Sequence, residues 1–509
     1  MGTGHVMRCL TLAEALRARG ARVQFVCRDH PGNLIALLRE RGIRTAVLPR
    51  PGADREPGEH YAAWLGTTQA EDAEQTIAGI EGEALDCLVV DHYGVGVEWE
   101  RCLRPRVGRL MAVDDLADRP HECDLLLDQN YAADGAARYS ALVPAGCMLL
   151  VGPRYALLNP AYASRRRSLR RHDGSVKRVF LFFGGADAQN ATGLALRALS
   201  GPGLSDLDVD VVINPASPHH AEIERQAAAR GRCTVHGALP HLADPMSRAD
   251  LAIGAGGATT WERMCLGVPA VLVSIAENQQ PACRALSRAG LVSYAGHISE
   301  IDADDIARAV RELLDAPSVV AERSTRNQLL VDGLGTARVV ESILPSGEDS
   351  LSLRPASEDD MALFHGWAND PVVRANAFSG EPISWPTHEA WFRARLQSAA
   401  ARLFVLEANR LPVGQVRFDL EGGEARIDYS LDELVRGRGW GARLLSAGMQ
   451  AMQRRAPVRF RAHVKSGNLA SRAVFESLGF KQETRSVADR YDFYLDSPQA
   501  ERTGAVSAG

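Results

Sequence analysis

The sequence has no cysteine pair at C-x-x-C spacing, no long apolar run and no large excess of either charge. Its nine cysteines are scattered, which excludes a zinc knuckle or redox dithiol and indicates reduced thiols, mostly in cores. The most apolar stretch, Val268–Ala276, is far shorter than the ~20 residues that span a bilayer. The formal net charge of -5 gives no pull toward nucleic acid or anionic lipid. We therefore expect a cytoplasmic protein without nucleic-acid or membrane partners, whose oligomeric state stays open.

The length of 509 residues exceeds one ordinary hydrophobic core, so several domains are expected. Up to residue 344, short apolar runs alternate with helical segments such as Met7–Arg19 and Ala221–Arg230, a pattern that predicts doubly wound α/β structure. We assign Rossmann-like lobes to 1–150 and 151–344, a linker to 345–350, an α+β domain to 351–496 and a disordered tail to 497–509. The expected strands of the two lobes are Arg22–Cys27, Cys87–Asp91, Arg109–Asp114, Arg178–Phe183, Asp208–Ile213 and Ala270–Ser274.

The chain opens on a glycine turn, Met1–His5, and a helix follows at once. A doubly wound lobe begins instead with a strand that feeds such a turn. The first strand is therefore expected to be missing, with Met1 a miscalled start inside a longer gene. A turn without its strand would leave the first lobe destabilised and the His5 side chain poorly fixed.

His5 stands where the glycine turn enters the helix. The positive helix end disfavours an imidazolium, which predicts a neutral imidazole able to accept a proton; a cap or surface role is the usual alternative. Polar clusters at three predicted strand ends strengthen the catalytic interpretation: Asp91–Gly94, Asp114–Asp115 and Asp128–Tyr131. Such positions face the ligand cleft of an open α/β sheet.

A second glycine run, Gly254–Glu262, begins a helix in the second lobe. Its glycines and Thr hydroxyls suit a diphosphate, and the Glu262 carboxylate can accept hydrogen bonds from both ribose hydroxyls. A glycine-rich strand-to-helix loop without a ligand is the alternative. With Gly267–Pro269 and Glu277–Gln279, this run resembles the nucleotide-sugar lobe of GT-B enzymes.

A third glycine run is Arg436-x-x-Gly439-x-Gly441, between a strand-like stretch at 427–432 and a predicted helix, Arg443–Met452. Glycines admit backbone N–H groups to a ligand at a helix N-terminus, which predicts a pyrophosphate cradle. Alone the pattern is weak, but Asn468–Ser471 and Phe475–Phe480 follow in order. Together these motifs resemble the GNAT N-acetyltransferase superfamily.

The GNAT resemblance implies acetyl-CoA as co-substrate and an oxyanion held by backbone N–H groups of the splayed strand, here 427–431. In many relatives a tyrosine protonates the leaving thiolate, but Phe475 occupies that position, so the proton donor stays open. Tyr429 is an available hydroxyl, with simple packing as its alternative role. The expected acetyl-CoA contacts are Tyr429, Leu431, Arg436, Gly437, Arg438, Gly439, Trp440, Gly441 and Asn468.

Residues 1–344 also resemble one family, the UDP-2,4-diacetamido-2,4,6-trideoxy-β-L-altropyranose hydrolases of pseudaminic acid biosynthesis. The motifs that carry this resemblance are Gly2–Leu10, Trp64–Gly66, Asp91–Tyr93, Asp114–His121, Leu127–Tyr131, Gly152–Leu158 and Phe183–Asp187. The resemblance implies that His5 is the general base toward water at the anomeric carbon, that Tyr93 lies near the reacting centre and that no metal takes part. The implied UDP-sugar contacts are Gly4, Asp91, Gly256, Gly257, Thr259, Thr260, Glu262, Asn278 and Gln279.

The preceding step of that pathway is N-acetylation of a UDP-4-amino sugar, and the GNAT segment resembles the enzyme of that step. The sequence therefore predicts a bifunctional enzyme of α/β class, with GT-B-like lobes followed by an α+β GNAT domain. Three alternatives stay open, because a fold does not fix the acceptor: a GT-B glycosyltransferase, a nucleotide-sugar-binding pseudoenzyme, and a GNAT that acetylates protein N-termini.

Overall fold

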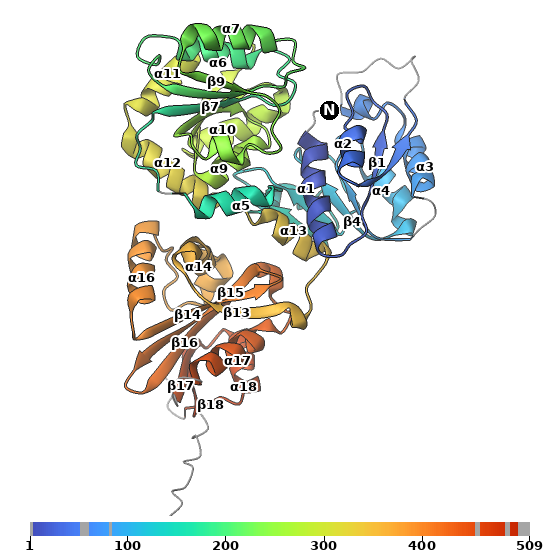
Figure 1. Cartoon of the computed structure of the whole chain (residues 1–509). Coiled ribbons are helices and arrows are strands. Elements are labelled where there is room, and N and C mark those ends of the chain that lie inside the picture. The colour runs from blue at the N-terminus through green and yellow to red at the C-terminus, as the bar shows by residue number, and fades with distance from the viewer. Residues whose placement is uncertain are drawn as a thin grey trace, which may run out of the picture. The chain divides into compact units, whose positions relative to one another are not determined.

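A computed structural model of the chain describes residues 4–50, 61–80, 84–169, 171–453, 459–483 and 489–496. The chain divides into two compact units, Met1–Leu344 and Pro345–Gly509 (Figure 1). The Gly2–Thr3 turn and the 497–509 tail of the sequence analysis lie outside the described residues. Within the described ranges, no helix is both long and apolar enough to cross a membrane.

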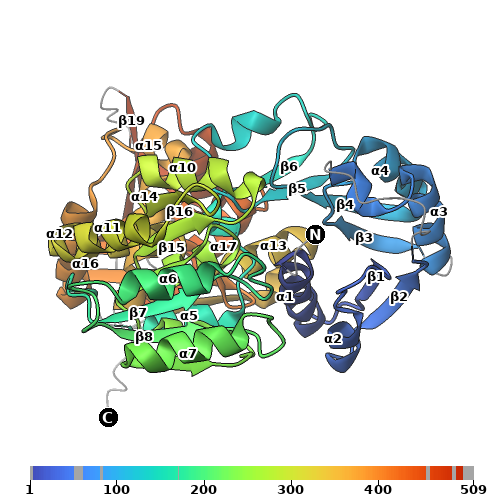
Figure 2. The same ribbon diagram turned by 90° about the horizontal axis from the view of Figure 1, so that it is seen from above.

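The first lobe of the N-terminal unit has two separate sheets (Figure 2). The strands β1 and β2 pair in parallel, and β3 to β6 form a four-stranded parallel sheet in sequential order. The elements are α1 (Gly4–Ala18), β1 (Gln24–Arg28), α2 (Ile35–Glu40), β2 (Arg44–Leu48), η1 (Tyr61–Leu65), α3 (Gln69–Gly79), β3 (Leu85–Val90), α4 (Val97–Leu103), η2 (Arg104–Arg106), β4 (Val107–Val113), β5 (Leu125–Asp128), η3 (Gly135–Tyr139) and β6 (Met148–Val151).

Helix α1 packs against both sheets of the first lobe. Its Leu12 and Leu16 share a cluster with Val89 of β3, while its Leu10 shares another with Phe25 of β1. Strand β5 is buried along its whole length, whereas every described residue of β1 is only half-buried. Among the described residues no ladder joins β1 to β3, so side-chain packing by α1 and α3, and not backbone pairing, connects the two sheets.

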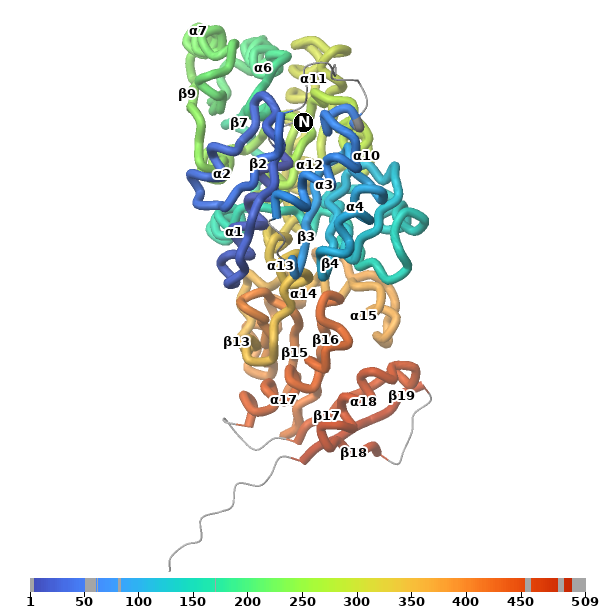
Figure 3. Tube along the Cα trace, turned by 90° about the vertical axis from the view of Figure 1, so that its right-hand side faces the viewer, coloured from blue at the N-terminus to red at the C-terminus, as the bar shows by residue number. Residues whose placement is uncertain are grey.

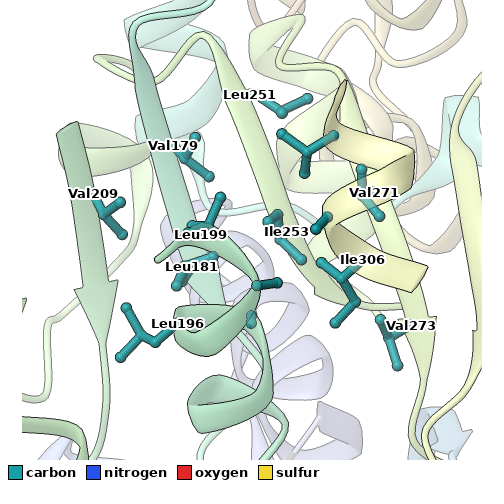
Figure 4. Packing of buried hydrophobic residues seen from close by; sticks show 14 of the residues in the cluster. Val179, Leu181, Leu196, Leu199, Val209, Leu251, Ile253, Val271, Val273 and Ile306 are labelled. Atoms are coloured by element: carbon teal, nitrogen blue, oxygen red, sulfur yellow. The ribbon is translucent and has the colours of Figure 1, made fainter. Parts of the chain in front are cut away.

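The second lobe is a six-stranded parallel sheet in the order β12-β11-β10-β7-β8-β9. Helices α6, α7 and α11 cover one face, and α5, α8, α9 and α10 the other. Figure 4 shows Leu181, Ile253 and Val271 on adjacent strands beneath α6 and α11. The elements are α5 (Pro160–Arg167), β7 (Arg178–Phe182), α6 (Ala191–Leu199), β8 (Asp208–Val212), α7 (His220–Arg230), β9 (Cys233–His236), α8 (Ala243–Met246), β10 (Leu251–Ala255), α9 (Thr259–Leu266), β11 (Ala270–Ser274), η5 (Glu277–Gln279), α10 (Gln280–Arg288), β12 (Ser293–His297), α11 (Ala303–Leu314) and α12 (Pro317–Leu330). Two further elements, η4 (Pro153–Tyr155) and α13 (Gly335–Ile343), pack into the core of the first lobe.

The C-terminal unit is a seven-stranded mixed sheet in the order β13-β14-β15-β16-β17-β19-β18 (Figure 3). Its strands are antiparallel except for the central pair, β16 and β17. The elements are η6 (Glu348–Ser350), β13 (Leu351–Pro355), η7 (Glu358–Asp360), α14 (Met361–Asn369), α15 (Pro371–Asn376), α16 (Trp385–Gln397), β14 (Ala401–Ala408), β15 (Leu411–Glu421), β16 (Glu424–Leu431), η8 (Glu433–Val435), α17 (Trp440–Gln453), β17 (Arg459–Lys465), α18 (Leu469–Ser477), β18 (Lys481–Gln482) and β19 (Arg490–Leu495).

The two parallel strands of the C-terminal unit separate partway along their length. Pairing runs from Glu424 opposite Arg459 to Ile427 opposite Ala462 and stops there, although β16 continues to Leu431. Backbone groups at 428–431 are therefore left without a β17 partner. This opening is the splay that the sequence predicts at 427–431.

The predicted fold class is confirmed: two Rossmann-type α/β lobes are followed by an α+β domain. Of the six expected strands, those at 178–183, 208–213 and 270–274 agree with β7, β8 and β11 to within a residue at each end. Those at 22–27, 87–91 and 109–114 differ from β1, β3 and β4 by one or two residues at each end. The expectation that the cysteines lie mostly in cores is confirmed, since seven of the nine belong to hydrophobic clusters or pack against them. Three thiols are buried, Cys123, Cys265 and Cys283, while five are half-buried and Cys102 is exposed.

Candidate functional sites

The first candidate site lies where α1 begins and β3 ends. His5 stands in the first turn of α1, and Asp91 directly follows β3. The Nδ1 atom of His5 lies 2.6 Å from Oδ1 of Asp91. Arg8, one turn further along α1, donates from Nε and Nη2 to the two oxygens of the same carboxylate at 2.6 and 2.7 Å. The helix start thus presents an imidazole and a guanidinium to one buried carboxylate.

The hydrogen bonds of Asp91 settle the tautomer of His5. Burial alone would raise the pKa of Asp91, but the charge and hydrogen bonds of Arg8, with a smaller contribution from His5, hold it well below its usual range. The carboxylate is therefore ionised and can only accept, so the Nδ1–H group of His5 donates to it. In neutral His5 this arrangement puts the lone pair on Nε2, which is the form that a general base requires.

A second carboxylate, Asp115, completes the cluster from the end of β4. The hydroxyl of Tyr93 donates to its Oδ2 at 2.6 Å and Nδ2 of Asn130 to its Oδ1 at 2.7 Å. Arg8 also lies within 2.8 Å of Asp115. Burial, and then the negative charge of Asp115, raise the pKa of Tyr93 well above its ordinary value. Tyr93 is therefore a neutral donor, and its ring meets that of His5 edge to face at 4.7 Å.

Aromatic rings line this cluster on the side of η1. Tyr61 lies edge to face with Tyr93 at 5.1 Å, and Trp64 packs against Tyr61 at 4.9 Å. The pKa of Tyr61 is raised by burial and, to a smaller extent, by the negative charges of Asp118 and Glu277. Glu277 begins η5 of the second lobe, so an acidic side chain of that lobe acts on Tyr61.

The glycine loop of the second lobe connects β10 to α9. A Cβ atom on Gly256 would lie 2.1 Å from the Sγ atom of Cys283, and one on Gly257 would lie 3.8 Å from the Gln279 amide. Only glycine fits at position 256, and Gln279 lies beside the loop. Gln279 is itself held by the backbone N–H of Ile275, which donates to its Oε1 at 3.1 Å.

The start of α9 directs its polar side chains inward. Thr260 is buried, and its hydroxyl accepts a hydrogen bond from Nη2 of Arg263, a guanidinium beneath the loop that also donates to the Ala255 carbonyl. Burial raises the pKa of the Glu262 carboxyl, and the Tyr162 hydroxyl opposes this shift through a hydrogen bond. The structure places Gly257 and Thr259 at the half-exposed lip of the loop, whereas Thr260 supports the loop from within. Asn278 lies half-buried in η5.

The third glycine loop, before α17, has the conformation that its sequence predicts. Gly437 and Gly439 have φ values of +80° and +77°, and a Cβ atom on either would project into open space. Arg436 is fixed beside the loop, because its Nε donates to the Leu431 carbonyl at 3.1 Å and its Nη2 lies 2.8 Å from Asp370. The loop therefore leaves open space beside its glycines next to a helix N-terminus, where an anion can approach the backbone. Trp440 and Gly441 are buried in the first turn of α17, with Arg438 over the Trp440 ring.

Tyr429 lies between the cradle and α18. Its hydroxyl donates to Oγ of Ser471 at 3.1 Å, and its ring packs edge to face on Phe475. Asn468 caps α18 by accepting from the backbone N–H of Ser471. Burial raises the pKa of Tyr429. Phe475 itself is 2% exposed and stacks on Phe493, so the tyrosine position of relatives is a core residue here.

The sequence analysis gave no role to Arg8, which the structure places at the centre of the first site. Its two carboxylate partners, Asp91 and Asp115, lie 83 and 107 residues away along the chain. The available signal was the i, i+3 spacing of His5 and Arg8, which puts both on one face of a helix. Among the described residues, no group of three or more His, Cys, Asp or Glu side chains could hold a metal ion.

Residues 350–481 match the family model of the acetyltransferase (GNAT) domain. The C-terminal unit carries a GNAT domain. The glycine loop at 436–441, the splay after Ile427 and the capping Asn468 all lie within the matched residues. The GNAT resemblance predicted from these motifs is confirmed.

Three curated proteins are similar to the chain. An uncharacterized protein of Methanocaldococcus jannaschii is 21% identical over 97% of this chain and 97% of its own length. The spore coat polysaccharide biosynthesis protein SpsG of Bacillus subtilis is 23% identical over 66% of this chain and 93% of its own. The UDP-2,4-diacetamido-2,4,6-trideoxy-beta-L-altropyranose hydrolase of Campylobacter jejuni is 23% identical over 57% and 93%. The resemblance to that hydrolase is confirmed. The crystal structure of MurG of Acinetobacter baumannii is 15% identical over 67% of this chain and 96% of its own, with a TM-score of 0.48.

Proposed function

We propose that the chain carries out two consecutive reactions on one UDP-linked amino sugar. The C-terminal unit transfers the acetyl group of acetyl-CoA to the 4-amino group of UDP-4-amino-4,6-dideoxy-N-acetyl-β-L-altrosamine. The N-terminal unit hydrolyses the product, UDP-2,4-diacetamido-2,4,6-trideoxy-β-L-altropyranose, to UDP and the free sugar. The observation that carries the hydrolase half is the His5–Asp91 pair, which fixes a basic Nε2 atom at the end of β3. The similarity to the Campylobacter hydrolase supports the same conclusion.

In the hydrolysis, Nε2 of His5 takes a proton from water as the water oxygen attacks the anomeric carbon. The bond from that carbon to the diphosphate oxygen breaks, and UDP leaves with the electron pair. Asp91 stabilises the imidazolium that forms, and Arg8 keeps Asp91 ionised. The loop at Gly256 and Gly257, beside the Gln279 side chain, is the proposed cradle of the diphosphate. No step calls for a metal ion.

The test is incubation of the purified chain with the UDP-linked 4-amino sugar and acetyl-CoA, with no other acceptor. We expect CoA thiol release first, UDP release second, and free diacetamido sugar in the product. Thiol release without UDP release would leave a nucleotide-sugar-binding pseudoenzyme. UDP release that begins only when a sugar or lipid acceptor is added would indicate a glycosyltransferase. Faster thiol release with N-terminal peptides than with the sugar would make protein N-termini the substrate.

We expect Gly439→Val to weaken acetyl-CoA binding by at least about tenfold, measured by calorimetry. The left-handed conformation costs a branched L-residue about 1–2 kcal/mol, and the side chain would project into the open space that the pyrophosphate needs. The matched control is Gly422→Val, because Gly422 also has a positive φ, +58°, and open space around its Cβ, but lies in the β15–β16 hairpin. Equal affinities of wild type and Gly439→Val would show that the glycine run is only a turn.

A further inference from the structure

At the splay of the GNAT unit lies His463, a histidine to which the glycine-loop cradle assigns no role. Pairing between β16 and β17 ends at Ala462, and His463 is the next residue. Burial along β17 alternates, so Phe460, Ala462 and Val464 are buried, whereas His463 is 28% exposed. His463 is therefore the first outward side chain beyond the point where the strands part.

The two faces of the sheet at the splay have different partners. Tyr429, Phe475 and Phe493 pack together on the face covered by α18. His463 and its β19 partner, Asp492, alternate with Ala462 and Phe493 and so point to the opposite face. The glycine loop begins α17, which packs with α18, so the acetyl-CoA cradle belongs to the α17–α18 face. The face of His463 is the one left for the amine that attacks the thioester.

Asp492 fixes the orientation and tautomer of His463. The Nδ1 atom of His463 lies 2.5 Å from Oδ1 of Asp492, and Arg490 donates to Oδ2 at 2.9 Å. Burial opposes ionisation of Asp492, but the hydrogen bonds of Arg490 and His463 lower its pKa. An ionised carboxylate accepts the Nδ1 proton, which leaves Nε2 as the basic atom. Among the described residues, none forms a hydrogen bond with Nε2 of His463.

The other charged groups on this face leave room for an amine. Lys465 donates to the Ala375 carbonyl at 3.1 Å, and Arg461 pairs with Glu424 and Glu483. Asp428 of β16 comes directly after the last paired residue of its strand and is about half exposed. Arg417, at 3.7 Å, is its nearest cation. Across the splay from His463 there is thus a carboxylate that can attract an ammonium group.

We propose that His463, oriented by Asp492, is the general base of the acetyl transfer. Its Nε2 takes a proton from the substrate ammonium group, and the nitrogen lone pair so freed attacks the thioester carbonyl carbon. The carbon–sulfur bond breaks, and the CoA sulfur leaves with the electron pair and takes up the second proton that nitrogen loses. The proposal rests on acetyl transfer to an amine as proposed above, and does not depend on which amine.

The test is His463→Gln, assayed by CoA thiol release with whichever of two amines the wild type acetylates faster, the UDP-linked amino sugar or an N-terminal peptide. We expect a fall of roughly 10²–10⁴-fold near neutral pH, the usual effect of losing a general base, and a remaining rate that rises with pH as the substrate amine loses its own proton. Asp492→Asn should lower the rate less. The affinity for acetyl-CoA, measured by calorimetry, should stay within about twofold in both variants.

Two controls separate a base from a structural residue. Hydroxylamine, used as the acetyl acceptor, is largely unprotonated at neutral pH and needs no base to free its lone pair. With this acceptor His463→Gln should therefore keep most of the wild-type rate. Arg426→Gln, an exposed change on the same face of β16 before the splay, should leave every rate unchanged. Equal losses with hydroxylamine and with the amine, or a wild-type pH profile in His463→Gln, would overturn the proposal. If the wild type acetylates the N-terminal peptide faster than the UDP-linked amino sugar, the proposed substrate is wrong, but the role of His463 is not affected.

Discussion

Replacement of His5 by Asn is expected to lower the proposed UDP release from the diacetamido sugar by roughly 10²–10⁴-fold, the usual effect of removing a general base. Asparagine retains a polar group next to Asp91 but has no basic nitrogen. Acetyl transfer is unchanged, because the GNAT domain lies in the other compact unit. The measurement is UDP release under single-turnover conditions, alongside thiol release from acetyl-CoA.

The matched control is His220→Asn, since His220 is a partly exposed histidine at the start of α7 in the same unit. Its UDP release should equal that of the wild type. Hydrolysis by His5→Asn within a few-fold of wild type would remove His5 from the mechanism. A parallel loss of acetyl transfer would instead indicate general unfolding.

Arg8→Met is expected to destabilise the N-terminal unit by about 3–5 kcal/mol at neutral pH, the usual cost of leaving buried charges without their partner. Arg8 is 7% exposed and lies between the carboxylates of Asp91 and Asp115. The measurement is the free energy of unfolding in denaturant. Arg41→Met is the control, because the Arg41–Glu14 pair is exposed and such pairs contribute only about 0–1 kcal/mol. A similar small change in both variants would show that Arg8 does not hold the cluster.

The Arg8→Met effect has a definite pH dependence. The pKa values of Asp91 and Asp115 are lowered in the folded protein. A carboxyl group whose pKa is lower in the folded than in the unfolded state stabilises the fold at any pH above its unfolded-state pKa of about 4. That stabilisation is lost as the pH falls through the folded-state pKa. The variant lacks this contribution, so its deficit should be largest near neutral pH and should shrink below about pH 4. A deficit that does not change with pH would mean that lost packing, not charge, is responsible.

Local patterns predicted most of the fold. The strands β7, β8 and β11 are apolar runs between glycine, aspartate or asparagine, and hydrophobic patterning alone places them. The glycine loops and the place of His5 at a helix start also follow from sequence. The expectation that the His5 side chain is poorly fixed is wrong, because its Nδ1 atom is held 2.6 Å from Asp91. The charge network does not follow from sequence, because Arg8, Asp91 and Asp115 meet only through the order of strands in the sheet. Nor does the pairing of His463 with Asp492, which depends on the register of β17 against β19.

In the described residues β1–β2 is a sheet separate from β3–β6. Local opening of β1 and β2 therefore breaks side-chain contacts with α1 and the Arg28–Asp72 ion pair to α3, but no backbone ladder to β3. Such an opening costs less free energy than global unfolding, and its amide protons exchange with solvent early. His5 lies on α1, which packs against both sheets. We therefore expect the proposed UDP release, which depends on His5, to fall when the small β1–β2 layer opens, at a temperature below that at which the whole unit unfolds.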